Sequence, residues 1–177
     1  LSLAHGVLAF LEQVQWLWLP DLPAMLVAGY LTWLWWSRAA MANRMLTVLH
    51  VAFAWLGPAF GLSALQSLLH DVTPGFLGQA PLHALTLGFF ASMLLGMASR
   101  VTMGHSGRPV AADEVMWRAF CTMQAAALLR VVSELPALPG AYHLMWLSSM
   151  LWLGAFALWV WRYAPACWRP REDGKPG

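Results

Sequence analysis

The sequence predicts an all-α fold, a polytopic transmembrane bundle of about six helices. Hydrophobic residues make up 60% of the 177 residues and charged residues only 10%, whereas ordinary soluble domains carry about 25% charged residues. Apolar runs near the length of a membrane span alternate with short segments rich in Pro, Gly and charged residues. The net charge of +2, without a basic stripe among aromatic residues, excludes nucleic-acid binding.

The first two predicted helices are short. An apolar run over 3–19 ends at Pro20 and Asp21, and a second run over 22–37 closes on tryptophans followed by Arg38. Trp and Arg together are typical of a membrane–water boundary. Because both runs fall below about 20 residues, we expect tilted helices or local thinning of the bilayer.

Longer helices are predicted over 44–70, 81–103, 114–134 and 141–163, followed by a cytoplasmic tail over 164–177. Asn43 is a typical N-cap for the first of them, and Gly57 with Pro58 predicts a kink in its middle. Pro81 suits the first turn of the next helix.

Basic residues predict the orientation of the bundle, because cytoplasmic loops collect Lys and Arg. Such residues occur in 37–44, in 100–118 and from 162 onward, and none occurs in 20–22, 71–80 or 135–140. Six spans with both ends in the cytoplasm follow from this asymmetry. That orientation assigns three histidines to the inner end (His5, His50 and His105) and three to the outer end (His70, His83 and His143).

The stretch from His83 to His105 organises the rest of the chain. At 100° per residue, both histidines fall on one side of a helix, together with Phe90, Leu94, Met97 and Val101. The opposite side carries Gly88, Ser92, Gly96 and Ser99. Small residues let helices approach closely in a membrane. We therefore predict one packing face and one candidate metal or haem face.

Three histidines are the candidate ligands: His50, His83 and His105. Neutral imidazole is a common ligand of haem iron and copper and brings no charge into the bilayer. A hydrogen-bonded interior histidine is the alternative interpretation for His50 and His83, and a polar interfacial residue or a contact to a phosphate or propionate is the alternative for His105. Arg100 and Arg108 flank the inner loop and are candidate partners of haem propionates, the alternative being that they only set the topology.

Two acidic residues in the predicted spans suggest different roles. Glu134 lies four residues after Arg130, so the two share a helix face and are expected to form an ion pair. Glu12 has no partner nearby in the sequence. Two interpretations remain: the Glu12 carboxyl group is protonated within the membrane, or it lies on a proton path.

The block from Pro81 to Arg108 resembles the NnrS family. Its segments PLHALTLGF and RVTMGHSGR are similar to the family's pattern, with Ser106 in the place of the usual Thr. The segments around His50 and over 162–165 are also similar. The family's proteins are larger, and the resemblance covers roughly their C-terminal half, so the N-terminal half of the same protein is an expected partner beside membrane lipid.

The resemblance implies a haem- and copper-containing protein of the bacterial inner membrane, linked to the nitric oxide response and to denitrification. It leaves open whether nitric oxide is substrate, ligand or inducing signal. The residues show no nucleophile–base pair, so no enzymatic activity is assigned. A transporter or permease and a structural subunit without metal remain the alternative functions.

Overall fold

The computed structural model describes residues 1–172, apart from the side chains of residues 39 and 40. The described part is helical, with these elements in order: α1 (Ser2–Phe10), η1 (Val14–Trp16), α2 (Trp18–Leu34), α3 (Arg38–Ala42), α4 (Arg44–Ala54), α5 (Leu56–Leu68), α6 (Ala80–His83), the π-helix η2 (Ala84–Ala91), α7 (Ser92–His105), α8 (Glu114–Val132), α9 (Ala141–Tyr163) and η3 (Ala164–Cys167). Of the predicted tail over 164–177, residues 173–177 lie outside the described residues.

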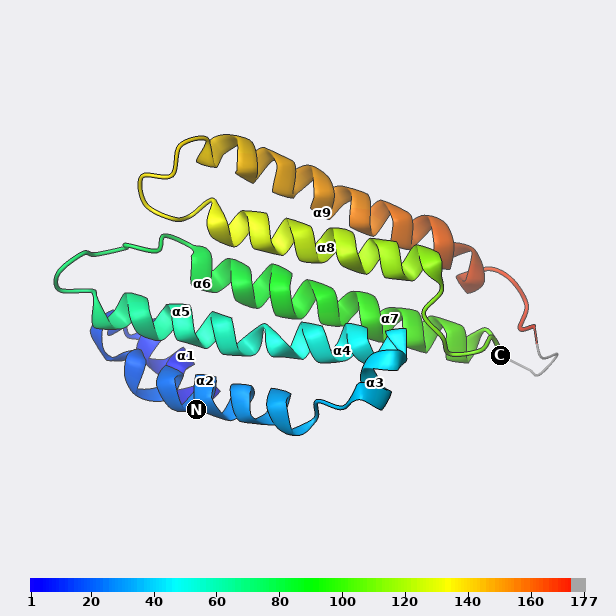
Figure 1. The fold of residues 1–177 in the computed structure, drawn as a ribbon, viewed down its shortest axis with the longest axis horizontal. Helices are drawn as coiled ribbons and strands as arrows, with labels where there is room; N and C mark the ends of the chain where they lie inside the picture. Colours follow the sequence, from blue (N-terminus) through cyan, green and yellow to red (C-terminus); the bar gives the residue numbers. More distant parts are fainter. Residues whose placement is uncertain (173–177) are drawn as a thin grey trace.

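The long helices lie side by side in the order α2, α4–α5, α6–η2–α7, α8 and α9 (Figure 1). Four of the described helices are long and apolar enough to cross a membrane, namely Arg44–Leu68, Ala80–His105, Glu114–Val132 and Ala141–Cys167. The predicted fold class, an all-α transmembrane bundle of about six helices, is thereby confirmed.

The N-terminal part differs from its prediction. The predicted turn at Pro20 and Asp21 is wrong, because both residues lie in the first turn of α2, where a proline gives up no helical hydrogen bond. The chain turns instead between Phe10 and Trp18, and Glu12 in this turn has φ 57° and is exposed. Helix α1 has only 9 residues and packs back on α2. Glu12 therefore does not lie in the middle of a span.

Helices α4 and α5 form one rod with a one-residue interruption. The Asn43 side chain accepts hydrogen bonds from the backbone N–H groups of Met45 and Leu46, which confirms the predicted N-cap. The rod is interrupted at Trp55, just before Gly57 and Pro58, where the sequence predicts a kink. The Trp55 ring Nε1–H donates to Gln124 Oε1 on α8 at 2.8 Å.

The small-residue side of α6–η2–α7 is the packing face, as predicted. Gly88, Ser92, Gly96 and Ser99 are all buried. Trp55 packs directly against Gly88, so a Cβ at Gly88 would meet its ring, and Val48 and Leu49 lie against Gly96. The rod α4–α5 and helix α8 can therefore approach the rod α6–η2–α7 closely, because these positions lack bulky side chains.

The structure does not align His83 with Phe90, Leu94, Met97 and Val101 on one side of this helix. Leu94, Met97 and Val101 point outward, with 57%, 45% and 52% of their surface exposed, and Phe90, 57% exposed, lines a pocket beside α5. The physical reason lies in η2, whose π-helical turns are wider than α-helical turns and change the angular step per residue. His83 precedes η2 and leaves the common line, so that its side chain is only 18% exposed.

Candidate functional site

The structure does not bring the predicted site residues together. His105 and Arg100 are exposed near the end of α7, and Arg108 donates from Nε to Glu172 Oε1 at 2.7 Å. His83 lies at the other end of the same rod. Within residues 1–172, no three His, Cys, Asp or Glu side chains gather as a metal site. The candidate ligands must therefore be judged one by one.

His50 lies on α4 against Trp36, with the two ring centroids 5.5 Å apart in an edge-to-face arrangement. Its Nε2 atom is buried and has no hydrogen-bond partner among the described residues. A buried nitrogen without a partner is unfavourable. His50 thus keeps one lone pair or N–H that a ligand would satisfy.

His83 belongs to an ionic cluster at the end of the bundle where α8 finishes. Arg130 Nη1 donates to Glu134 Oε1 at 2.6 Å, which confirms the predicted ion pair. His83 Nε2 lies 3.4 Å from the same oxygen without hydrogen-bond geometry. Like His50 Nε2, it is a buried ring nitrogen without a hydrogen-bond partner among the described residues.

Glu134 also fastens the loop that leads into α6. Its Oε2 accepts from the backbone N–H of Gln79 at 3.0 Å. Burial raises the pKa of Glu134, but the Gln79 hydrogen bond and the charge of Arg130 outweigh burial and lower it below its ordinary value. Gly78 has φ +50°, and a Cβ there would meet Glu134 Oε2, so the close passage of the loop requires glycine.

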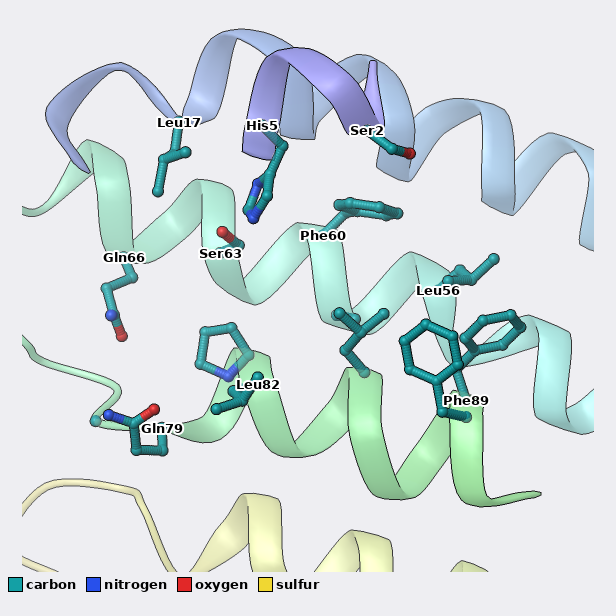
Figure 2. Close-up of a pocket in the computed structure, with 15 residues that line it drawn as sticks. Ser2, His5, Leu17, Leu56, Phe60, Ser63, Gln66, Gln79, Leu82 and Phe89 are labelled. Atoms are coloured by element: carbon teal, nitrogen blue, oxygen red, sulfur yellow. The ribbon is translucent and has the colours of Figure 1, made fainter. Parts of the chain in front are cut away.

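The same end of the bundle contains a pocket of about 450 Å³ between α1, α5, α6 and η2 (Figure 2). Most of its wall is apolar, including Phe60, Phe89 and Phe90. The polar side chains that line it are Ser2, His5, Ser63, Gln66 and Gln79. Gln66 Oε1 is buried without a hydrogen-bond partner in the described residues. Small-ligand and cofactor sites have this size and this mostly apolar character.

His5 and Asp21 form the most distinctive pair in this pocket region. His5 Nδ1–H donates to Asp21 Oδ1 at 2.7 Å, and Asp21 is fully buried at 0% exposure. Asp21 lies in the first turn of α2, where the helix dipole favours a negative charge. Figure 2 shows the His5 ring directed from α1 towards α5, beside Ser63. Since Asp21 engages Nδ1, Nε2 is the nitrogen left for a ligand.

The assignment of His5 to the inner end is wrong. The turn between α1 and α2 places His5 near Gln79, at the end whose loops carry no Lys or Arg. Sequence reasoning also missed Asp21, because it interpreted Pro20 and Asp21 as a turn. A histidine and an aspartate 16 residues apart carry no helical spacing that would have indicated their contact.

A family model described as NnrS protein matches residues 1–171. The chain belongs to the NnrS family. No curated protein and no solved structure matches it. Family membership and the four helices of spanning length make this chain a membrane protein of the NnrS type. The pocket, the His5–Asp21 pair and the Glu134 cluster all lie within the matched part of this NnrS chain.

Proposed function

We propose that this NnrS protein is a multi-pass protein of the bacterial inner membrane that binds haem in the pocket between α1, α5 and η2 and acts in the nitric oxide response. His5 is the proposed iron ligand. One observation carries the proposal: a histidine held by a buried carboxylate through Nδ1 lines an apolar pocket of about 450 Å³.

The donor set fits haem because a haem iron needs only one or two protein ligands. A histidine that ligates a metal usually donates the N–H of its other ring nitrogen to a carboxylate, which fixes the tautomer and the orientation of the ring. Asp21 is placed for that role towards His5. The aromatic wall formed by Phe60 and Phe89 suits a flat apolar ring system. When bound, the haem iron would supply the site at which a small gas such as nitric oxide coordinates.

Protein residues have three tasks in this proposal. His5 presents Nε2 to the pocket, Asp21 keeps the proton on Nδ1, and the apolar side chains of the wall keep water away. Gln66 has an unpaired oxygen in the same wall and offers a hydrogen-bond acceptor to a ligand. His50 is the second candidate ligand, on the strength of its unpartnered Nε2.

Copper, which the resemblance also implies, fits less well. Copper sites usually combine several His, Cys or Met ligands. In the described part of the chain, no three His, Cys, Asp or Glu side chains gather at one place. The described residues therefore favour haem, and no role is derived for copper.

The alternative functions receive less support. A transporter would use interrupted helices and charges near the middle of the membrane. At the interruption of the helix, the Trp55 side chain is held by its hydrogen bond to Gln124. Glu12 is exposed in a turn. A purely structural subunit would give no reason for His5, which is held by the buried Asp21, to line a pocket.

Haem binding to the full-length protein in detergent tests the proposal. We expect the purified protein to show a haem Soret band that shifts when nitric oxide is added. The variant His5→Ala should lose the haem, and Asp21→Asn should bind it about 10- to 100-fold more weakly. His143→Ala is the matched control, because His143 is an exposed histidine in the first turn of α9. Unchanged haem content in His5→Ala would refute the assignment, and loss in His50→Ala alone would move the site to α4.

A further inference from the structure

The end of the bundle opposite the pocket gathers arginines around the last turns of α9. A hollow of about 240 Å³ is lined there by Arg108, Arg162, Arg169, Trp161 and Pro165. These residues come from the loop after α7, from the end of α9, from η3 and from the segment that follows η3. Neither the proposed haem pocket nor the Glu134 cluster includes any of them.

Two of the arginines are held in place by carboxylates. Arg108 Nε donates to Glu172 Oε1 at 2.7 Å, and Arg162 Nε donates to Asp113 Oδ2. Both bonds use Nε, so the terminal nitrogens of each guanidinium group can face a third partner. Three arginines against two carboxylates leave a net charge of +1 around the hollow.

The loop that carries Arg108 is tied to the C-terminal segment. The backbone N–H of Glu172 donates to the carbonyl oxygen of Ser106 at 3.0 Å. Arg108 itself is only 17% exposed. Two of the three arginines of the hollow are therefore held by fixed contacts, and Arg169 completes it as an exposed side chain.

The hollow lies where the spanning part of α9 ends. That span finishes at Cys167, and Trp161 and Trp168 are 71% and 81% exposed. Exposed Trp beside Arg is typical of the level of the lipid headgroups. Further into the span, Trp161 also lines an almost wholly apolar groove between α8 and α9, together with Gly154, Ala157 and Leu158, and this groove offers an apolar track beneath the charged hollow.

We propose that this hollow binds an anionic phospholipid, with its phosphate between Arg108, Arg162 and Arg169 and one acyl chain along Trp161 and α9. Guanidinium groups match phosphate oxygens with paired hydrogen bonds. Basic pockets between helices at the cytoplasmic surface take phospholipid headgroups. The inference rests on the proposed haem site in one step only, the exclusion of a haem propionate as the bound anion.

A haem propionate would use the same chemistry, but the distances argue against it. The rod that connects the pocket to this end, Ala80–His105, has 26 residues and is about 39 Å long at an α-helical rise. A haem held by His5 near the start of that rod cannot reach Arg108 beyond its other end. The basic hollow therefore needs a partner of its own.

The test compares lipids on the full-length protein in detergent by native mass spectrometry and thermal unfolding. We expect phosphatidylglycerol to be retained and to stabilise the protein more than phosphatidylcholine. Arg169→Gln should lower the affinity for phosphatidylglycerol about fivefold, because one basic residue near a membrane surface contributes about that factor. Arg169 is exposed, so this variant should still fold.

Arg100→Gln is the matched control, because Arg100 is an exposed arginine of α7 that does not line the hollow. Its retention of phosphatidylglycerol should equal that of the unmodified protein. Equal binding of phosphatidylcholine, or an equal loss in both variants, would overturn the proposal. If glycerol phosphate without acyl chains competes as well as the intact lipid, the hollow is a free-anion site and the lipid assignment fails.

Discussion

Gly88 offers the sharpest test of how the bundle is packed. It lies inside η2, and a Cβ there would overlap Cγ, Cδ2 and Cε3 of the Trp55 ring. The ring has to move by roughly 1 Å to restore an ordinary contact of about 3.5 Å or more. Trp55 Nε1 now lies 2.8 Å from Gln124 Oε1, so such a shift takes the pair out of hydrogen-bond range.

The expected loss follows from these contacts. Overpacking a well-filled interior costs about 1–3 kcal/mol, and the lost hydrogen bond adds about 0.5–1.5 kcal/mol. Replacing glycine by alanine in a helix returns about 1 kcal/mol. Gly88→Ala should therefore lower the free energy of unfolding by about 0.5–3.5 kcal/mol. For a chain of this length, the unfolding temperature should fall by about 1–14 °C.

Thermal unfolding in detergent, followed by tryptophan fluorescence, measures this change. Gly104→Ala is the matched control, because Gly104 lies in α7 and a Cβ there meets nothing within 4 Å. The control should unfold at the same or a higher temperature. If Gly88→Ala unfolds with the control, the contact between Trp55 and η2 is not a tight one and the packing argument fails.

Two further predictions concern the ionic cluster and the orientation. Since the pKa of Glu134 is lowered in the folded protein, its contribution to stability is present above the ordinary glutamate value of about 4.3 and is lost as the pH falls below it. Between about pH 7 and pH 3.5, the protein should thus lose more thermal stability than Glu134→Gln, and an equal loss would refute the role of the Arg130 pair. For the orientation, a cysteine at the exposed Ala111 should be labelled only from the cytoplasm and one at the exposed Thr73 only from outside, in a chain without its two native cysteines. The reverse pattern would invert the orientation.

Local sequence signals predicted the central and C-terminal helices well because each signal acts within a few residues. Asn43 caps α4, the helix is interrupted three residues before Pro58, and Arg130 pairs with Glu134 four residues later. The small residues around Gly88 and Gly96 predicted the packing face for the same reason. These features depend on backbone geometry and neighbouring side chains, both of which the sequence displays directly.

The candidate site could not be predicted because it depends on contacts between distant segments. Pro20 suggested the end of a helix, although proline is equally suited to a first turn. This error hid the chain reversal that brings His5 to Asp21. The π-helix was a second obstacle, since projection at 100° per residue fails where the turn is wider. His83 was consequently grouped with Phe90 and other outward-facing residues.

The π-helix also connects the packing of the bundle to the proposed site. Gly88 packs on Trp55 from one side of η2, while Leu85, Phe89 and Phe90 of the same element line the pocket. The wide π-helical turn lets Phe89 and Phe90 reach the pocket wall, while Gly88, which directly precedes them, stays buried. π-Helical segments are often found at functional sites. If Gly88→Ala displaces η2 in addition to the Trp55 ring, it should weaken haem binding as well as stability. Loss of stability alone would separate the packing of η2 from the pocket.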